Sequence, residues 1–454
     1  MISDLHVHVG DWTDRRFEPV ATVRQLLKRE GIGFVGVSST TACSHPYSLK
    51  KVLMEGSELL AAFPGQVFHW LWIHPDHIPR SLSGLTAKIH GLKLHPYEHD
   101  WHSNPKLLPQ AFELARQHCV PILMHTGGRA ECSAGRFADI LTRFPSVRVI
   151  LAHARPMDEA IEVSRKCPNA WFDTAFVSAE SLAKADLADI LNRFVFGSDY
   201  PIDGILQNKT YTAIRSAFPS QSLEQVDSAT RRFLGETLWR PIVDAITERF
   251  HKWHQAKAGW RLPGCPADHR LPSFIRTGDL PETNAERMDS IAEQWHKEFC
   301  SAAGNDARRL RLAADFLSVW GGIRNNKLAT IERYLPYVET CTVPCRFQGI
   351  ASWSKLLFLA DPSRFAIYDS RVARAMNRCL TEAGVHDWRF PVPPGRQSAQ
   401  QADDESKGSP TLARTAAYGI YLDLITLAAE AVGRPLRDVE FALFASGAAA
   451  TEQR

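Results

Sequence analysis

Residues 4–10 read DLHVHVG and residues 194–201 read FVFGSDYP, at the two ends of a pattern that fills the first 200 residues. Between them, short apolar runs alternate with longer amphipathic stretches such as 106–118, KLLPQAFELARQH. Short runs rich in Val, Ile, Leu and Phe indicate strands, and the amphipathic stretches indicate helices. We predict eight strands, at 2–8, 32–39, 68–74, 89–95, 121–125, 148–153, 171–175 and 194–199.

Alternation of strands and helices predicts right-handed βαβ units and a parallel sheet. Eight such units fit a closed (β/α)8 TIM-type barrel. An open, doubly wound sheet is the alternative, although no GxGxxG or GxxxxGK[ST] motif follows any of the strands. We therefore predict an α/β fold class, with a barrel over residues 1–250 and a mostly α-helical second domain.

The character of the chain changes after the barrel. Residues 251–283 include a Pro- and Gly-rich stretch, AGWRLPGCPADHRLPSF, and are predicted to form a linker. The pattern of residues 284–454 is mostly helical. Within it, residues 391–410 are polar and rich in Pro, Ser and Gln, and are predicted to form a mobile loop.

The composition is that of a globular protein of nearly neutral charge. Fifty-three Lys and Arg against 50 Asp and Glu give a formal net charge of +3, which excludes a histone-like polybasic chain. No apolar run reaches the roughly 18 residues of a membrane span. The nine cysteines are not clustered, and the first residues do not resemble a signal peptide. These features predict a cytoplasmic protein without a membrane partner.

The placement of certain histidines is more informative than their number, 18. His6 and His8 lie two residues apart on the first predicted strand, so their side chains share one face. His125 and His153 end the fifth and sixth strands, and Asp199 ends the eighth. The carboxyl ends of barrel strands converge on one mouth. We therefore predict a site there for one or two divalent metal ions, preferably Zn²⁺, with Mn²⁺, Fe²⁺ or Ni²⁺ as alternatives.

The segments DLHVHVG, GLKLHP, PILMHTGG, VILAHAR and FVFGSDYP together resemble the metal-dependent amidohydrolase superfamily, over roughly residues 1–245. The resemblance implies that His6, His8 and His125 bind the main metal ion. Asp199 would bind it too and would accept a proton from the attacking water. His153 would bind a second metal ion or stabilise the transition state. Such a site activates water for hydrolysis.

The role of Lys93, in GLKLHP, is open. In binuclear members of that superfamily a carboxylated lysine at the matching place bridges two metal ions, whereas in a mononuclear member Lys93 would contact the substrate or point elsewhere. His95, Arg129 and Arg155 are candidate substrate-binding residues. The two arginines directly follow the fifth and sixth strands, where they could pair with an anionic group.

Other polar residues near the strand ends are weaker candidates. His74 and His77 in IHPDH, and His99 in HPYEHD, are further ligands, pocket residues or surface residues. Asp173 ends the seventh predicted strand and is a candidate hydrogen-bonding partner of a metal-bound histidine.

The HxH segment and the HP dipeptide after the third strand also resemble the TatD-like metal-dependent deoxyribonucleases. Those enzymes usually carry an acidic metal ligand in a GEIGLD-like element on the fourth strand. Lys93 stands in that element here, and FGSDYP fits the amidohydrolase form better. A TatD-like nuclease is therefore kept as the alternative.

In the second domain, residues 346–376, RFQGIASWSKLLFLADPSRFAIYDSRVARAM, resemble the helix-hairpin-helix core of DNA glycosylases related to the 8-oxoguanine enzymes. The resemblance implies Lys355 as nucleophile and Asp369 as its catalytic partner. The family's second hairpin glycine is replaced by Ala351, and Trp353 stands at the family's lysine position. A non-catalytic module that binds DNA or a partner is thus an alternative, and Asp369 could simply cap a helix.

Residues 305–375 contain eleven Arg or Lys and six Asp or Glu, an excess that favours contact with phosphates. The whole sequence predicts a metal-dependent hydrolase joined to a nucleic-acid-related helical domain. Its substrate would be a small molecule or derive from nucleic acid, in metabolism, repair or defence. The alternatives are a TatD-like nuclease, an active glycosylase and a non-catalytic scaffold. The sequence does not identify a protein partner.

Overall fold

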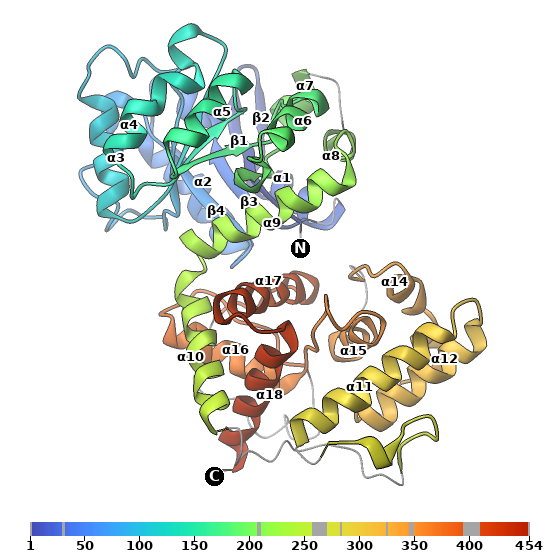
Figure 1. Ribbon diagram of the computed structural model, residues 1–454. Helices are drawn as coiled ribbons and strands as arrows, with labels where there is room; N and C mark the ends of the chain where they lie inside the picture. Colours follow the sequence, from blue (N-terminus) through green and yellow to red (C-terminus); the bar gives the residue numbers. More distant parts are fainter. Residues whose placement is uncertain are drawn as a thin grey trace. The chain divides into compact units, whose positions relative to one another are not determined.

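The computed structural model describes residues 2–29, 32–206, 210–256, 270–281, 284–323, 326–344, 349–393 and 409–452. The chain divides into two compact units, Met1–Arg240 and Pro241–Arg454 (Figure 1). Helix α10 (Arg240–Ala256) starts at this division and runs past residue 250, the predicted end of the barrel.

The first unit is built on a curled nine-stranded sheet with the order β2-β1-β3-β4-β5-β6-β7-β8-β9. Neighbours from β1 to β9 are parallel, and only β2 runs antiparallel to β1. The strands are β1 (Ile2–Trp12), β2 (Arg15–Phe17), β3 (Ile32–Ser39), β4 (Val67–Trp72), β5 (Gly91–Leu94), β6 (Ile122–His125), β7 (Val149–Ala152), β8 (Ala170–Asp173) and β9 (Phe194–Val195). Strands β3 to β5 are buried throughout, as expected of a parallel sheet that is covered on both faces.

The predicted closed barrel is correct only in part. Among the described residues β9 has two residues instead of the predicted 194–199, and no strand pair joins β9 to β1. Three backbone hydrogen bonds span this gap: Leu5 N–H donates to the carbonyl of Phe196 (2.9 Å), Asp199 N–H to His6 (2.8 Å) and His8 N–H to Tyr200 (2.7 Å). The sheet is therefore an incompletely closed barrel. The hydrogen bonds that bridge its gap include His6, His8 and Asp199, which belong to the predicted metal site.

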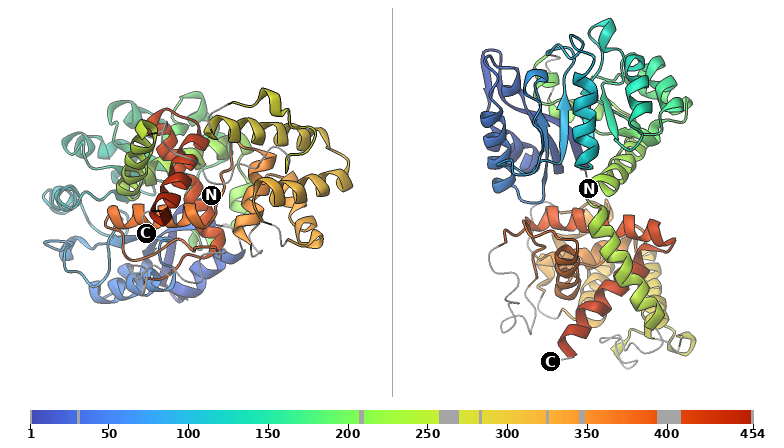
Figure 2. Two further views of the ribbon diagram at one scale, coloured as in Figure 1. Left: turned by 90° about the horizontal axis from the view of Figure 1, so that it is seen from below. Right: turned by 90° about the vertical axis from the view of Figure 1, so that its left-hand side faces the viewer.

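Helices surround the curled sheet (Figure 2). They are α1 (Pro19–Arg29), α2 (Leu49–Ala62), α3 (Leu107–Gln117), α4 (Ala138–Arg143), α5 (Met157–Lys166), α6 (Ala179–Leu187), α7 (Ile202–Leu206), α8 (Tyr211–Ser216) and α9 (Ser220–Thr237). Gly56 shows how closely α2 approaches the sheet, since a Cβ atom at this position would lie 2.2 Å from the ring of His69 in β4. Apolar residues of the strands and of the inner helix faces form one core.

The second unit is helical, as predicted. Its main helices are α10, α11 (Asn284–Ser301), α12 (Asp306–Asp315), α13 (Leu328–Glu332), α14 (Leu335–Glu339), α15 (Ile350–Ala360), α16 (Ser370–Glu382), α17 (Arg414–Val432) and α18 (Leu436–Glu452). An ion pair between Arg249 and Glu382 joins α10 to α16. Most of the predicted mobile loop and part of the predicted linker, 394–408 and 257–269, lie outside the described residues.

None of the described helices is, by itself, both long enough and apolar enough to cross a membrane. One bent pair, Ala416–Val432 with Leu436–Gly447, meets both requirements only when its two helices are taken together.

Candidate metal centre

Two histidines of β1 begin the site. Alternate residues of a strand face the same side, so His6 and His8 both point into the mouth of the curled sheet. Both are buried, and their Nε2 atoms lie 3.2 Å apart. The turn after β9 brings in Asp199, whose Oδ1 lies 2.6 Å from His8 Nε2 and 3.4 Å from His6 Nε2. The ligand atoms of these three residues all lie within 4.8 Å of one another, as binding to one metal ion requires.

The protonation states of Asp199 and His6 fit a metal ion. Burial alone would raise the pKa of Asp199, but the adjacent His6 and His8 outweigh it and lower that pKa, so the carboxylate is charged. Burial, with the nearby charge of Lys93, lowers the pKa of His6, which is therefore neutral. Asp199 Oδ1 is buried and has no partner in hydrogen-bonding geometry. Neutral imidazoles and an ionised carboxylate are the forms that bind divalent metals.

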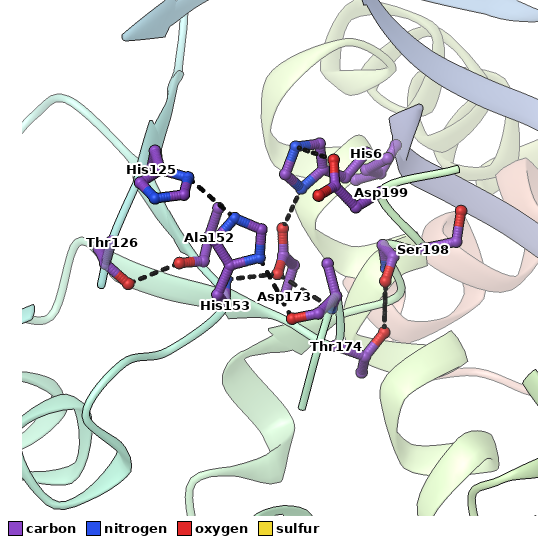
Figure 3. A network of polar contacts seen from close by, with 12 residues as sticks. His6, His125, Thr126, Ala152, His153, Asp173, Thr174, Ser198 and Asp199 are labelled. Carbon is purple, nitrogen blue, oxygen red and sulfur yellow. Dashed lines mark hydrogen bonds and ion pairs between the residues drawn. The ribbon is translucent and has the colours of Figure 1, made fainter. Parts of the chain in front are cut away.

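Asp173, at the end of β8, fixes the orientation of His6 (Figure 3). Its Oδ2 lies 2.7 Å from His6 Nδ1, while its Oδ1 accepts the backbone N–H groups of His153 (2.7 Å) and Ala175 (3.1 Å). Burial raises the pKa of Asp173, while His153 and its backbone N–H lower it; the ionised carboxylate only accepts hydrogen bonds, and His6 then carries its hydrogen on Nδ1. The unprotonated Nε2 of His6 therefore faces Asp199, and Asp173 contacts a histidine of the predicted metal site.

His125 and His153 face each other across the ends of β6 and β7 (Figure 3). His153 Nδ1 lies 3.2 Å from the carbonyl of Ala175, and His153 Nε2 lies 3.0 Å from His125 Nδ1. A carbonyl only accepts, so His153 donates from Nδ1 and accepts at Nε2 from His125. This leaves Nε2 of His125 unprotonated and able to bind a ligand. The chain is left-handed at His153 (φ 69°) and at Asp199 (φ 54°), a conformation that costs free energy and is common at functional sites.

Lys93 and His95 come from β5 and the residue that follows it. Lys93 is fully buried, its Nζ lies 2.9 Å from His6 Nε2, and burial lowers its pKa to about 8. The His95 ring stacks between those of Trp72, at 5.0 Å between ring centres, and His125, at 4.1 Å. Its Nδ1 accepts the N–H of Glu98 (3.1 Å). A neutral His95 therefore carries its hydrogen on Nε2 and is a hydrogen-bond donor.

A pocket of about 340 Å³ opens above these residues. Residues that the strand pattern did not indicate as site residues form much of its wall, among them Trp12, Trp72, Tyr97 and Phe176. Each lies at a strand end or follows one by a few residues, and that position was the one sequence signal that could have identified it.

The two candidate arginines differ in position. Arg155 lines the pocket and donates to the carbonyl of Phe176 (3.1 Å), with its guanidinium 5.2 Å from the centre of that ring. Arg129 is exposed, is not part of the pocket lining and stacks 4.5 Å from the ring centre of Tyr97. Arg155 thus belongs to the pocket wall, whereas Arg129 contacts that wall only through Tyr97.

The two candidate residues of the second unit have structural partners. Lys355 in α15 is 7% exposed, its Nζ donates to the carbonyl of Gly321 (2.7 Å), and burial lowers its pKa. Asp369 precedes α16 and accepts the N–H groups of Arg371 (2.9 Å) and Val372 (3.0 Å), so it caps that helix. Residues 345–348, which begin the predicted hairpin, lie outside the described residues.

Comparison with known proteins supports the fold predicted for the first unit. Residues 58–205 match the family model described as Amidohydrolase, a segment that is less than half of the chain and includes His125, His153 and Asp199. No curated protein matches the chain. The first unit has a metal-dependent amidohydrolase fold, and the protein is an enzyme of the metal-dependent hydrolase type.

Several solved structures match the chain at low sequence identity. One from Acinetobacter baumannii, described as a probable 2-pyrone-4,6-dicarboxylic acid hydrolase with citric acid bound, is 12% identical over 50% of this chain and 98% of its own, with a TM-score of 0.36. Amidohydrolase 2 from Bifidobacterium longum subsp. infantis is 13% identical over 52% and 97%, with a TM-score of 0.37. IDCase from Metarhizium anisopliae is 15% identical over 49% and 78%, with a TM-score of 0.32. These similarities are too low to transfer a substrate.

Proposed function

We propose that this metal-dependent hydrolase binds one Zn²⁺ ion through His6, His8 and Asp199 and hydrolyses a C–N or C–O bond of a small, flat, anionic substrate. The convergence of these three ligand atoms within 4.8 Å carries the proposal. Two imidazoles and a carboxylate suit zinc. His125, with its unprotonated Nε2, is the proposed fourth protein ligand. When bound, the ion supplies a Lewis acid and a water of lowered pKa.

Asp199 is the proposed general base. It is charged, and the carboxylate oxygen that does not bind the ion can accept a proton from the attacking water and pass it to the leaving group. His95 is proposed to donate its Nε2 hydrogen to an oxygen of the substrate. His153 holds His125 through the hydrogen bond at 3.0 Å, which makes it a positioning residue.

The substrate class follows from the pocket wall. Four aromatic side chains, those of Trp12, Trp72, Tyr97 and Phe176, favour a flat, unsaturated molecule in a volume of about 340 Å³. Arg155 adds a guanidinium, which pairs with a carboxylate through two parallel hydrogen bonds. We therefore propose a cyclic ester or amide that carries at least one carboxylate.

Two substitutions separate metal binding from proton transfer. His8→Ala should lose both the bound zinc and turnover, whereas Asp199→Asn should lower turnover by about 10²–10⁴-fold even when zinc is restored by excess metal. Zinc content after dialysis and hydrolysis of a panel of cyclic ester and amide carboxylates are the measurements. Asp139→Asn, on the outer helix α4, is the matched control and should change neither. A wild-type chain that retains no zinc would contradict the proposal.

The link to nucleic acid rests on the second unit and stays a prediction. A glycosylase mechanism needs Lys355 to reach a sugar carbon, but its Nζ is buried and donates to Gly321. We therefore expect borohydride to trap no covalent adduct with DNA. An adduct that disappears in Lys355→Ala would establish the glycosylase instead. The nuclease alternative predicts metal-dependent cleavage of a labelled oligonucleotide, lost in Asp199→Asn.

A further inference from the structure

A second group of histidines lies at the rim of the same mouth. His74 and His77 belong to the turn after β4, and His99 to the loop after β5. The ring centres of His74 and His99 are 4.5 Å apart, and those of His74 and His77 are 5.7 Å apart. Two imidazoles that bind one tetrahedral ion at about 2.0–2.1 Å have ring centres roughly 5 Å apart. The separations of the His74 ring from its two neighbours are therefore close to those of ligands to a shared ion.

We propose that His74, His77 and His99 form a second cation site, for one transition metal ion that favours imidazole ligands, such as Zn²⁺, Ni²⁺ or Cu²⁺. We name these three residues the rim cluster. The proposal does not depend on the reaction proposed for the central site.

His99 supplies the independent observation. It is 5% exposed and donates to the backbone of Ala42, yet its buried Nδ1 has no hydrogen-bond partner. A buried polar atom without a partner is unfavourable unless it has a role. Burial lowers the pKa of His99 to about 4, so the ring is neutral near pH 7, and its nearest ring neighbour is His74 at 4.5 Å between ring centres.

His74 has a carboxylate nearby that suits ligation. Its Nδ1 accepts the N–H of Asp76 at 3.2 Å and lies 3.7 Å from Asp76 Oδ2. That hydrogen bond places the hydrogen of a neutral His74 on Nε2, so ligation through Nε2 requires the other tautomer, in which Nδ1–H gives up the N–H of Asp76 and moves towards Asp76 Oδ2. A carboxylate that accepts from the far nitrogen of a metal-bound histidine is the usual arrangement in metal sites.

The rim cluster is separated from the central trio by the indole ring of Trp72. The centre of that ring lies 6.2 Å from the centre of the His99 ring and 5.6 Å from the centre of the His8 ring. The Tyr47 ring stacks 5.2 Å from the ring of His77 and donates its hydroxyl to the Trp72 carbonyl (3.2 Å). None of the three rim histidines lines the pocket. An ion here would thus be additional to the central ion.

Ligation requires a movement of the His77 side chain and a change of tautomer at His74. Within the described ranges, only the two central groups, His6–His8–Asp199 and His6–His153–Asp173, have every ligand atom within 4.8 Å. His77 is exposed, so its side chain can turn towards His74 and His99 without unpacking the core.

Zinc binding to the purified full-length chain tests the proposal by equilibrium dialysis over increasing free zinc. We expect two ions per wild-type chain, one tight and one weaker. His77→Ala, an exposed position that should not disturb folding, and His74→Ala should each weaken the second ion at least 10-fold and leave the first unchanged. His8→Ala should remove the first and keep the second, which separates this proposal from the central site. His102→Ala, an exposed histidine of the same loop as His99, is the matched control.

Three outcomes would overturn the rim site. The wild type could bind only one ion at all zinc concentrations. His102→Ala could weaken the second ion as much as His77→Ala, which would indicate non-specific binding to surface histidines. Finally, the second ion could be lost in Lys93→Met and kept in His74→Ala, which would place it in a binuclear central site bridged by a modified Lys93.

Discussion

Among single residues, Asp173 has a decisive influence on the metal centre although the proposed metal ligands do not include it. It accepts from His6 Nδ1 through Oδ2 and from two backbone N–H groups through Oδ1. The backbone contacts fix which oxygen faces His6. The tautomer of His6, and thus the lone pair on Nε2, depends on that single carboxylate oxygen.

Asp173→Asn tests this dependence. The amide oxygen would keep the two backbone N–H groups, so the amide NH₂ would face His6 Nδ1 and force the hydrogen of His6 onto Nε2. We expect zinc affinity to fall by about 10–100-fold while the fold persists. Competition with a coloured chelator measures the affinity, and circular dichroism checks the fold. Asp186→Asn on α6 serves as control; equal affinity in all three proteins would disprove the role of Asp173.

The site residues that the sequence can identify are those with a positional signature. The spacing of His6 and His8, and the position of Asp199 after an apolar run, are enough to indicate a shared mouth. Tautomers depend on contacts between residues distant in sequence, such as that of His6 with Asp173, and sequence carries no sign of them. The choice between Arg155 and Arg129 also depends on loop conformation, which the strand pattern does not determine.

At the scale of elements, α2 depends on a glycine for its contact with the sheet. In an isolated helix, Gly56→Ala would stabilise by about 1 kcal/mol. Here the added methyl group would lie 2.2 Å from the ring of the buried His69. We therefore expect net destabilisation of about 1–3 kcal/mol, measured by urea unfolding. Gly278→Ala, where a Cβ atom meets nothing within 4 Å, should change stability little. Stabilisation by Gly56→Ala would show that α2 can move away.

Helix α18 buries Glu440, which makes the stability of the second unit depend on pH. Glu440 is 4% exposed, its Oε2 has no partner, and burial raises its pKa to about 8 from 4.5. Between these values the folded state holds a proton that the unfolded state has released, so stability falls as pH rises, by at most about 1.4 kcal/mol per pH unit.

Glu440→Gln removes this titration. We expect its unfolding temperature, relative to that of the wild type, to rise between pH about 5 and pH about 8. Differential scanning calorimetry of both proteins measures the difference, with Glu430→Gln, an exposed position of α17, as control. A difference that stays constant over this pH range would show that Glu440 ionises normally.

The strand pattern predicts the order and approximate bounds of the elements of the first unit. It fails at the last strand and at the short β2. The apolar run FVF predicts a strand that continues through residue 199. Gly197 instead packs closely, since a Cβ atom there would lie 2.8 Å from the Cβ of His6, and Asp199 adopts a left-handed conformation. Neither a close approach nor a positive φ at a non-glycine residue has a signature in hydrophobic periodicity. The short β2 was missed because its residues, RRF, are mostly polar.

For the whole molecule, two compact units predict two unfolding transitions with different responses to metal. Ligand binding stabilises the folded state by about 2.7 kcal/mol at a concentration of 100 times Kd. Removal of metal by a chelator should therefore lower the transition of the first unit and leave that of the second unchanged. Calorimetry with and without chelator measures this, and His8→Ala, which lacks the tightly bound central ion, should respond less than the wild type. A joint shift of both transitions would show that the units unfold together.

The hydrogen bonds between β1 and residues 196–200 have a consequence for synthesis in the cell. His6 and His8 leave the ribosome long before Asp199 is translated, so the nascent chain carries an incomplete set of ligands for most of the translation of the first unit. The same closing step that joins the end of the sheet to its beginning also completes the set. We therefore expect the central metal ion to bind late in biogenesis. A chain whose synthesis stops before residue 199 should not bind that ion.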